Sequence, residues 1–291
     1  MLSIIIPTLN EEEYLPILLR SIKKQSYKDY EIIIADAGST DETLEIAKKY
    51  GCKITGGGHP GRGRNMGVKR AKGDLLLFLD ADAELPRKFL VRFLRECERR
   101  QFDIAGCALK IKNRRKIYRL IEKLYSLYFT STQKFYPHAT NCIFIEASLH
   151  EAIGGFDENI LLGEDFMYVR AAAKKGRFGF ISNIYFYASP RRAEDDMTKL
   201  ITQYLLAEGY MTFIGPIRSD IFKYRFGYSV TEKNRGVISW MNDKEMGELY
   251  TFILRALKKD VSPSQFKNIF NPHIKTFLKK IEKKNEEKSI F

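Results

Sequence analysis

Two aspartates, Asp80 and Asp82, stand two positions apart directly after an apolar run, 75–79. A short apolar run bounded by polar residues is typical of a strand buried on both faces, and open α/β sheets bind ligands at the carboxyl ends of such strands. Two carboxylates brought together there repel each other, and a divalent cation such as Mg²⁺ or Mn²⁺ relieves the repulsion. The spacing is therefore compatible with a metal site, and the alternative is that both residues cap the next helix.

A second pair of carboxylates, Asp36 and Asp41, follows another apolar run, 30–35. A carboxylate at the end of a strand in such a sheet commonly reaches a ribose hydroxyl or a base edge of a bound nucleotide. Asp41 has an alternative role as the cap of a helix that begins at Glu42, while Asp36 has less structural reason to stand there. We therefore expect Asp36 to contact a ligand.

Glycine and arginine alternate in the segment 61–67, which reads Gly-Arg-Gly-Arg-Asn-Met-Gly. Glycines let the backbone approach a phosphate, and arginines bind phosphate with two parallel hydrogen bonds. Arg62 and Arg64 are therefore candidates for phosphate contacts. The segment lacks the Gly-Lys-Ser/Thr ending of a Walker loop, and a solvated basic turn explains it equally well.

A third pair of carboxylates, Glu164 and Asp165, opens a segment with helical spacing, 164–175. Carboxylates in the first turn are favoured by the helix dipole, and a carboxylate in a cleft can also serve as a general base. The residues alone leave both interpretations open.

The elements that would position these residues alternate along the first half of the chain. Apolar runs predict strands and apolar residues at helical spacing predict helices, which together indicate a doubly wound, mostly parallel sheet with flanking helices. Asn10 is expected to cap the first helix. The predicted strands lie at 2–7, 30–35, 52–55, 75–79, 104–111, 142–145 and 179–188, and the predicted helices at 12–24, 42–50, 62–71, 88–101, 147–153 and 164–175.

The composition limits the class of protein. A net charge of +13 over 291 residues implies anionic partners such as nucleotide phosphates or an acidic membrane surface. No apolar run is long enough for a transmembrane helix, and the N-terminus reads as a strand instead of a signal peptide. Four scattered cysteines without a CxxC pair indicate reduced thiols and a cytoplasmic protein.

Taken together, the motifs resemble family 2 glycosyltransferases of the GT-A fold. The resemblance covers roughly residues 1–190 and implies a catalytic domain with a nucleotide-sugar half (1–100) and an acceptor half (101–190). The resemblance does not extend to residues 191–291, which are expected to form a mainly helical C-terminal extension. The motifs, in order, are Ile-Ile-Pro-Thr-Leu-Asn-Glu (5–11), Asp-Ala-Gly-Ser-Thr-Asp (36–41), Gly-Arg-Asn-Met-Gly (63–67), Leu-Asp-Ala-Asp (79–82), Gly-Gly-Phe-Asp-Glu (154–158) and Gly-Glu-Asp-Phe (163–166).

The family implies an inverting enzyme that uses a nucleotide-diphospho-sugar, UDP before GDP, with Mg²⁺ or Mn²⁺. The acceptor is expected to be a glycan, a lipid-linked phosphate or a small metabolite. By resemblance, Asp165 is the general base, Glu164 orients it or the acceptor, Asp82 is the direct metal ligand, and Asp80 contacts the ribose or a metal-bound water. The other nucleotide-sugar contacts are expected from Pro7, Thr8, Asn10, Glu11, Asp36, Asp41, Arg62, Arg64, Asn65 and Ala81, and from Arg191 or Arg192, which stand where some members carry a metal-binding histidine.

The segment 115–131 is expected to be a helix with a wide apolar arc that includes Leu124 and Tyr128. Basic residues at its start and tyrosines in the arc favour contact with an anionic membrane surface, on the cytoplasmic side, and hence a lipid-linked acceptor. The polar stripe beside the arc holds Arg119, Glu122, Lys123, Ser126 and Thr130. A wide apolar arc is also typical of a helix packed into a core, which is the alternative.

Two other functions compete with sugar transfer. A sugar nucleotidyltransferase would carry a glycine-rich, basic signature after the first strand, where this chain has Pro-Thr-Leu-Asn-Glu. A basic binding module without catalysis is the second alternative, but no RNP-like motif or zinc-finger spacing is present, so we expect no nucleic-acid partner.

Overall fold

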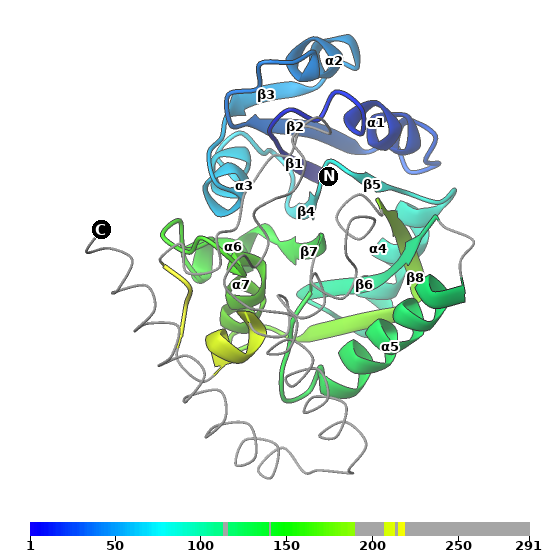
Figure 1. Cartoon of the computed structure of the whole chain (residues 1–291), viewed down its shortest axis with the longest axis vertical. Coiled ribbons are helices and arrows are strands. Elements are labelled where there is room, and N and C mark those ends of the chain that lie inside the picture. Colours follow the sequence, from blue (N-terminus) through cyan, green and yellow to red (C-terminus); the bar gives the residue numbers. More distant parts are fainter. Residues whose placement is uncertain (113–115, 140, 190–206, 213–214, 219–291) are drawn as a thin grey trace, which may run out of the picture.

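One mixed sheet of eight strands runs through the part of the chain that the structure, a computed structural model, describes: residues 1–112, 116–139, 141–189, 207–212 and 215–218. The strand order is β3-β2-β1-β4-β7-β6-β8-β5, and helices pack on both sides (Figure 1). The α/β fold with a mostly parallel, Rossmann-like sheet and flanking helices is therefore confirmed.

The first half of the sheet is parallel, as predicted. Helices connect its strands, because the chain must cross back to the end of the sheet where the previous strand began before a parallel strand can start. The elements of this half are β1 (Leu2–Thr8), α1 (Leu15–Lys23), β2 (Tyr30–Asp36), α2 (Thr43–Lys49), β3 (Lys53–Gly56), α3 (Pro60–Val68) and β4 (Leu75–Leu79).

The second half of the sheet mixes directions. Strand β7 runs antiparallel to its neighbours β4 and β6, and the two-residue strand β5, which the sequence did not predict, pairs antiparallel with β8. The elements are β5 (Ala83–Glu84), α4 (Phe89–Arg100), β6 (Ile104–Ile111), α5 (Lys116–Thr132), β7 (Cys142–Glu146), α6 (Ala147–Ala152), α7 (Glu164–Ala172) and β8 (Phe178–Ala188).

The central strands are apolar throughout because both of their faces are covered. Ile4 and Ile6 of β1 pack on one side with helices α1, α2 and α4, while Ile5 packs on the other with α3, α6 and α7. Each fully buried isoleucine of this kind contributes roughly 1.5–3 kcal/mol relative to an exposed one. This two-sided core fixes the strands whose carboxyl ends carry the candidate site.

The predicted cap at Asn10 is wrong. Helix α1 begins at Leu15 after Tyr14, and Asn10 adopts a left-handed conformation (φ 53°). Its Oδ1 accepts a hydrogen bond from the backbone N–H of Thr40 at 2.9 Å. Asn is among the residues that tolerate this conformation, so Asn10 joins the loops after β1 and β2 instead.

The apolar arc predicted for α5 is buried on one side and exposed on the other. Tyr118 and Phe129 are buried against the sheet, so the core interpretation is correct for them. Leu124 and Leu127 are 56% and 64% exposed. Within the described residues, no helix combines the length and the apolar character that crossing a bilayer requires.

Most of the expected C-terminal extension, with Arg191 and Arg192, lies outside the described residues. Residues 207–212 are helical, and Ile217 forms an antiparallel bridge with Leu162. Figure 1 shows these two segments, in yellow, beside α7 and the chain that leads into it.

Candidate active site

Strands β1 and β2 end side by side, with Thr8 opposite Asp36. The Asp36 carboxylate accepts hydrogen bonds from the Thr8 hydroxyl (2.9 Å), the Ser39 hydroxyl (2.5 Å) and the N–H groups of Gly38 and Ser39 (3.0 and 2.8 Å). Asp36 is buried and folds the loop that follows β2, so it has a structural role that the sequence did not indicate. Its contact with a nucleotide stays a prediction.

The loops after β1 and β2 are tied together by side chains. Asp41 accepts hydrogen bonds from the N–H groups of Glu12 (3.1 Å) and Thr43 (3.0 Å), and the Thr43 hydroxyl accepts one from the Glu11 N–H (2.8 Å). Asp41 thus satisfies a donor at the start of α2, which was its alternative interpretation. These bonds hold the predicted nucleotide contacts, Thr8 to Glu11, beside Asp36.

Arg64 is a buried cation, 4% exposed, that joins two distant carboxylates. Its Nη2 donates to Oδ1 of Asp80 (3.0 Å), and its Nη1 donates to Oε1 of Glu164 (2.6 Å). Burial alone would lower the pKa of Arg64, but the carboxylates of Glu164, Asp80 and Asp165 raise it overall. The guanidinium therefore stays charged and links the end of β4 to the start of α7.

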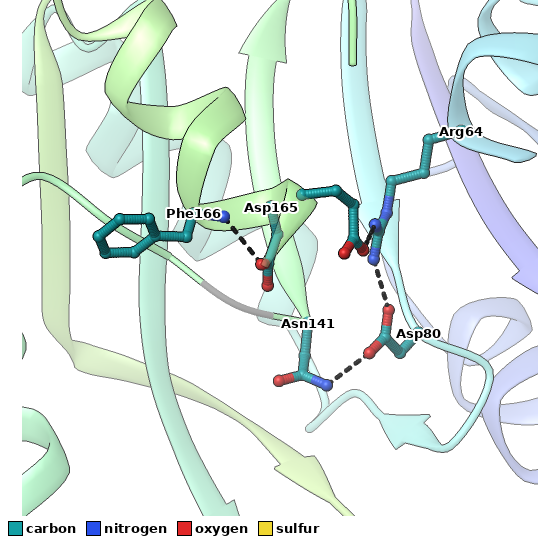
Figure 2. Close-up of polar contacts among 6 residues, drawn as sticks. Arg64, Asp80, Asn141, Asp165 and Phe166 are labelled. Carbon is teal, nitrogen blue, oxygen red and sulfur yellow. Dashed lines mark hydrogen bonds and ion pairs between the residues drawn. The ribbon is translucent and has the colours of Figure 1, made fainter. Parts of the chain in front are cut away.

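Asp80 is held from both sides. Asn141, directly before β7, donates from Nδ2 to Oδ2 of Asp80 (2.5 Å), while Arg64 donates to Oδ1. Figure 2 shows Arg64, Asp80, Asn141 and Asp165 arranged around one region. The sequence did not predict a role for Asn141. Its position next to Asp80 follows from the antiparallel pairing of β7 with β4, which the residue pattern did not reveal.

Asp165 lies in the first turn of α7 beside this network. Its Oδ1 accepts a hydrogen bond from the Phe166 N–H at 2.8 Å (Figure 2). Burial and the neighbouring Glu164 carboxylate raise the pKa of Asp165 to about 7, and Arg64 opposes the shift. A carboxyl group with this pKa can take up a proton near neutral pH, as a general base must.

The glycine- and arginine-rich segment is not a loop, because residues 61–67 lie inside α3. Gly63 and Gly67 face the sheet: a Cβ on Gly67 would lie 2.4 Å from Cγ2 of Ile5, and a Cβ on Gly63 would lie 3.3 Å from Cβ of Pro7. They let α3 approach β1, so the prediction that they open the backbone to a phosphate is not needed to explain them. Arg62 is exposed on the same helix, and its phosphate contact stays a prediction.

Asn65 joins α3 to the turn that holds the Gly-Gly-Phe-Asp-Glu motif. Its Nδ2 donates to the Phe156 carbonyl (2.8 Å) and to Oε1 of Glu158 (2.9 Å), and its Oδ1 accepts from the Phe156 N–H (2.9 Å). This motif is therefore fixed against α3. The segment that follows it leads to Glu164 and Asp165. The contact of Asn65 with a bound nucleotide stays a prediction.

The residues at the end of β4 fit a metal ion that arrives with a diphosphate. Both oxygens of Asp80 have protein partners, Ala81 is buried, and Asp82 is partly exposed. Among the described residues no three His, Cys, Asp or Glu side chains gather as a metal site. Mg²⁺ and Mn²⁺ are often held by one or two carboxylates together with substrate phosphates, so Asp82 is the better candidate for the direct ligand.

The sheet order and the helices on both faces are those of the GT-A fold. The sequence profile of Glycosyl transferase family 2 matches residues 3–152, and the chain belongs to this family.

Similar proteins agree with this assignment. Poly(ribitol-phosphate) beta-N-acetylglucosaminyltransferase TarS of Staphylococcus aureus is 28% identical over 206 residues, which cover 66% of this chain and 36% of that relative. This chain thus spans only part of the length of that relative.

Two solved structures share the fold. S. aureus TarS 1–349 in complex with UDP has a TM-score of 0.54 at 24% identity, covering 73% of this chain and 72% of that one. A mannosyltransferase of Pyrobaculum calidifontis, in complex with GDP-Man and Mn²⁺, has a TM-score of 0.59 at 19% identity, covering 72% of this chain and 63% of that one. At these identities the likeness establishes the fold alone.

Proposed function

We propose that the protein is an inverting glycosyltransferase that moves a sugar from a nucleotide-diphospho-sugar, UDP before GDP, to an acceptor hydroxyl or lipid phosphate. The observation that carries the proposal is Asp165, whose pKa is raised to about 7 beside a buried network that reaches the end of β4. Relatives named as poly(ribitol-phosphate) N-acetylglucosaminyl- and glucosyltransferases support sugar transfer. Neighbours solved with UDP, UDP-GlcNAc and GDP-Man support the donor class.

In the proposed reaction Asp165 takes the proton of the acceptor hydroxyl. The acceptor oxygen then forms a bond to the anomeric carbon while the bond from that carbon to the diphosphate oxygen breaks, and the electron pair leaves with the diphosphate. Attack on the face opposite the leaving group inverts the anomeric centre, so one carboxylate on the acceptor side is enough. Arg64 holds Glu164, the residue before the base, and thereby fixes the first turn of α7.

A divalent metal, Mg²⁺ or Mn²⁺, is part of the proposal, with Asp82 as its direct ligand and Asp80 beside it. Such an ion neutralises the charge that develops on the leaving diphosphate. Arg64 and Asn141 keep Asp80 in place at the end of β4. The neighbour solved with GDP-Man and Mn²⁺ supports this assignment.

The two competing functions have less support. A sugar nucleotidyltransferase and a non-catalytic binding module both leave the family match and the shifted pKa of Asp165 unexplained.

The acceptor is proposed to be presented at a membrane, with the protein peripheral on the cytoplasmic face. The support is the outer face of α5, where Leu124, Leu127 and the following Phe135 are 56%, 64% and 74% exposed. The exposed charged residues that the structure describes on α5, Arg119 and Lys123, are basic. Glu122 points inward, because its carboxylate accepts a hydrogen bond from the Ile111 N–H at 2.7 Å. Apolar and basic side chains together suit an anionic lipid surface.

A donor panel tests the proposed function. The full chain is mixed with UDP-GlcNAc, UDP-glucose or GDP-mannose, with and without Mn²⁺, and the release of nucleoside diphosphate is measured. We expect metal-dependent release from at least one donor, and NMR of the product should show an inverted anomeric centre. Absence of release from every donor, together with no thermal shift on adding UDP and Mn²⁺, would contradict the proposal.

A further inference from the structure

Residues 207–212 and 215–218, called the latch below, pack against the turn that leads into α7. Gly163 precedes α7 with φ 77°, and a Cβ built on it would lie 2.2 Å from Sδ of Met211. Met211 therefore lies directly on this turn, and it is buried at 7% exposure. The next two residues after Gly163 are Glu164 and Asp165, so Met211 contacts the chain two positions before the proposed base.

The latch also binds the turn through its backbone and its charges. The Leu161 N–H donates to the Ile217 carbonyl at 2.9 Å, and Leu162 forms a bridge with Ile217. Arg218 donates to both carboxylate oxygens of Asp157, at 3.2 and 2.6 Å. The latch thus contacts the start, the middle and the end of the segment 157–163.

Glu208 anchors the other side of the latch in a buried polar cluster. The Tyr128 hydroxyl of α5 donates to Glu208, and Nε2 of His138 lies 3.8 Å from the same carboxylate oxygen. The His138 ring in turn contacts the ring of Phe166, with centroids 5.7 Å apart. Phe166 follows Asp165, so this cluster also reaches the start of α7.

We propose that the latch positions Glu164 and Asp165 by holding the segment 157–163, and that the protonation of Glu208 sets how firmly the latch is docked. The inference extends the proposed function, since it concerns the placing of the base. The docking itself does not depend on sugar transfer.

The hydrogen bonds around His138 explain why a proton on Glu208 matters. Nδ1 of His138 lies 2.7 Å from the Tyr136 carbonyl, which can only accept, so Nδ1 carries the proton and Nε2 is an acceptor. Nε2 has no hydrogen-bond partner among the described residues. Burial lowers the pKa of His138 to about 4, so the ring is neutral. An ionised Glu208 would face this buried acceptor with another acceptor, while a protonated Glu208 offers a donor.

The surroundings of Glu208 give the direction of the pH effect. Burial raises the pKa of Glu208 from 4.5 to about 7, against the Tyr128 hydroxyl and Arg170, which favour the ionised form. The tyrosines of the cluster, Tyr128 and Tyr136, stay neutral because burial raises the pKa of both. Docking is therefore strongest below about pH 4.5 and weakens as the pH rises through about 7.

Hydrogen–deuterium exchange of the full chain tests the positioning role. In Met211→Ala, amides in 157–166 should exchange about tenfold faster or more, because truncating a buried methionine removes the packing under Gly163. Peptides from β1 and β4 should exchange as in the wild type, which shows that the variant folds. The control is Ile17→Ala, an exposed apolar position on α1, which should leave 157–166 unchanged. Wild-type exchange of 157–166 in Met211→Ala would overturn the proposal.

The protonation of Glu208 is tested by the same measurement at pH 6 and pH 8, after correction for intrinsic exchange rates. The wild type should lose protection of 157–166 at pH 8, and Glu208→Gln, which is neutral at both pH values, should keep it. A variant that loses protection as the wild type does would overturn the role of Glu208. Calorimetry of UDP with Mn²⁺ should give wild-type affinity in Met211→Ala and in Glu208→Gln, since the latch does not touch the strand ends. The exchange results do not depend on whether the protein transfers a sugar, so the two proposals can fail separately.

Discussion

Arg64 is the residue that connects the two sides of the candidate site, because it is buried and paired with both Asp80 and Glu164. Removing one partner of a buried ion pair leaves the other charge uncompensated, which typically costs about 3–5 kcal/mol. We therefore expect Arg64→Met to lower the free energy of unfolding by about this amount in urea titrations. The matched control is Arg62→Met, exposed two positions earlier on α3, which should change little. Equal stability of the two variants would show that the network contributes nothing.

Asp82 is expected to carry the metal. Asp82→Ala should abolish Mn²⁺-dependent binding of UDP in calorimetry while the circular dichroism spectrum and the unfolding temperature stay unchanged, because the side chain is partly exposed. Asp74→Ala, at a carboxylate that is 92% exposed, is the control and should bind as the wild type. Unimpaired Mn²⁺-dependent binding by Asp82→Ala would contradict the assignment.

At the residue scale, the sequence identified groups whose chemistry is local. The positions of Asp80, Asp82 and Asp165 could be predicted, because each stands after a strand or at the start of a helix, while their roles stay predictions. Their partners could not: Arg64 and Glu164 are 100 positions apart, and Asn141 is 61 positions from Asp80. Such pairs depend on how the elements pack, which a single sequence does not state.

Helix α5 is the element on which the membrane proposal depends. The double variant Leu124→Glu, Leu127→Glu should reduce sedimentation with liposomes that contain anionic lipid, because it replaces the exposed apolar face with charge. Both leucines are more than half exposed, so the variant should unfold at the wild-type temperature. Ile17→Glu on α1 is the control. A wild type that stays in the supernatant at low salt would rule out the membrane contact.

At the element scale, helices and buried strands were predictable from apolar periodicity, with ends shifted by a few residues. The direction of β7 was not, since a strand buried on both faces reads the same in either direction. Strand β5 is too short to leave a pattern. The contact between Met211 and the turn before α7 joins residues 48 positions apart (163 and 211), and no local pattern in the sequence indicates it.

The whole molecule should be less stable as the pH rises through neutrality. Burial raises the pKa of Asp165 and of Glu208 from 3.8 and 4.5 to about 7 in the folded chain. Because the folded state binds these protons more tightly, its stability is fully present below about pH 4 and is lost as the pH rises through about 7. The unfolding temperature should therefore fall between pH 6 and pH 8, and less so in Asp165→Asn, Glu208→Gln. A wild-type unfolding temperature that does not change over this window would contradict both shifts.

The measurement that tests the central claim most directly compares turnover and donor binding in Asp165→Asn. A general base typically contributes about 10²–10⁴-fold to the rate, so turnover should fall by that factor while calorimetry gives wild-type affinity for UDP and Mn²⁺. In Glu208→Gln, whose latch should stay docked at both pH values, turnover should rise with pH through about 7, where Asp165 loses its proton. Turnover near the wild-type rate in Asp165→Asn, or a parallel loss of UDP binding, would show that Asp165 is not the base.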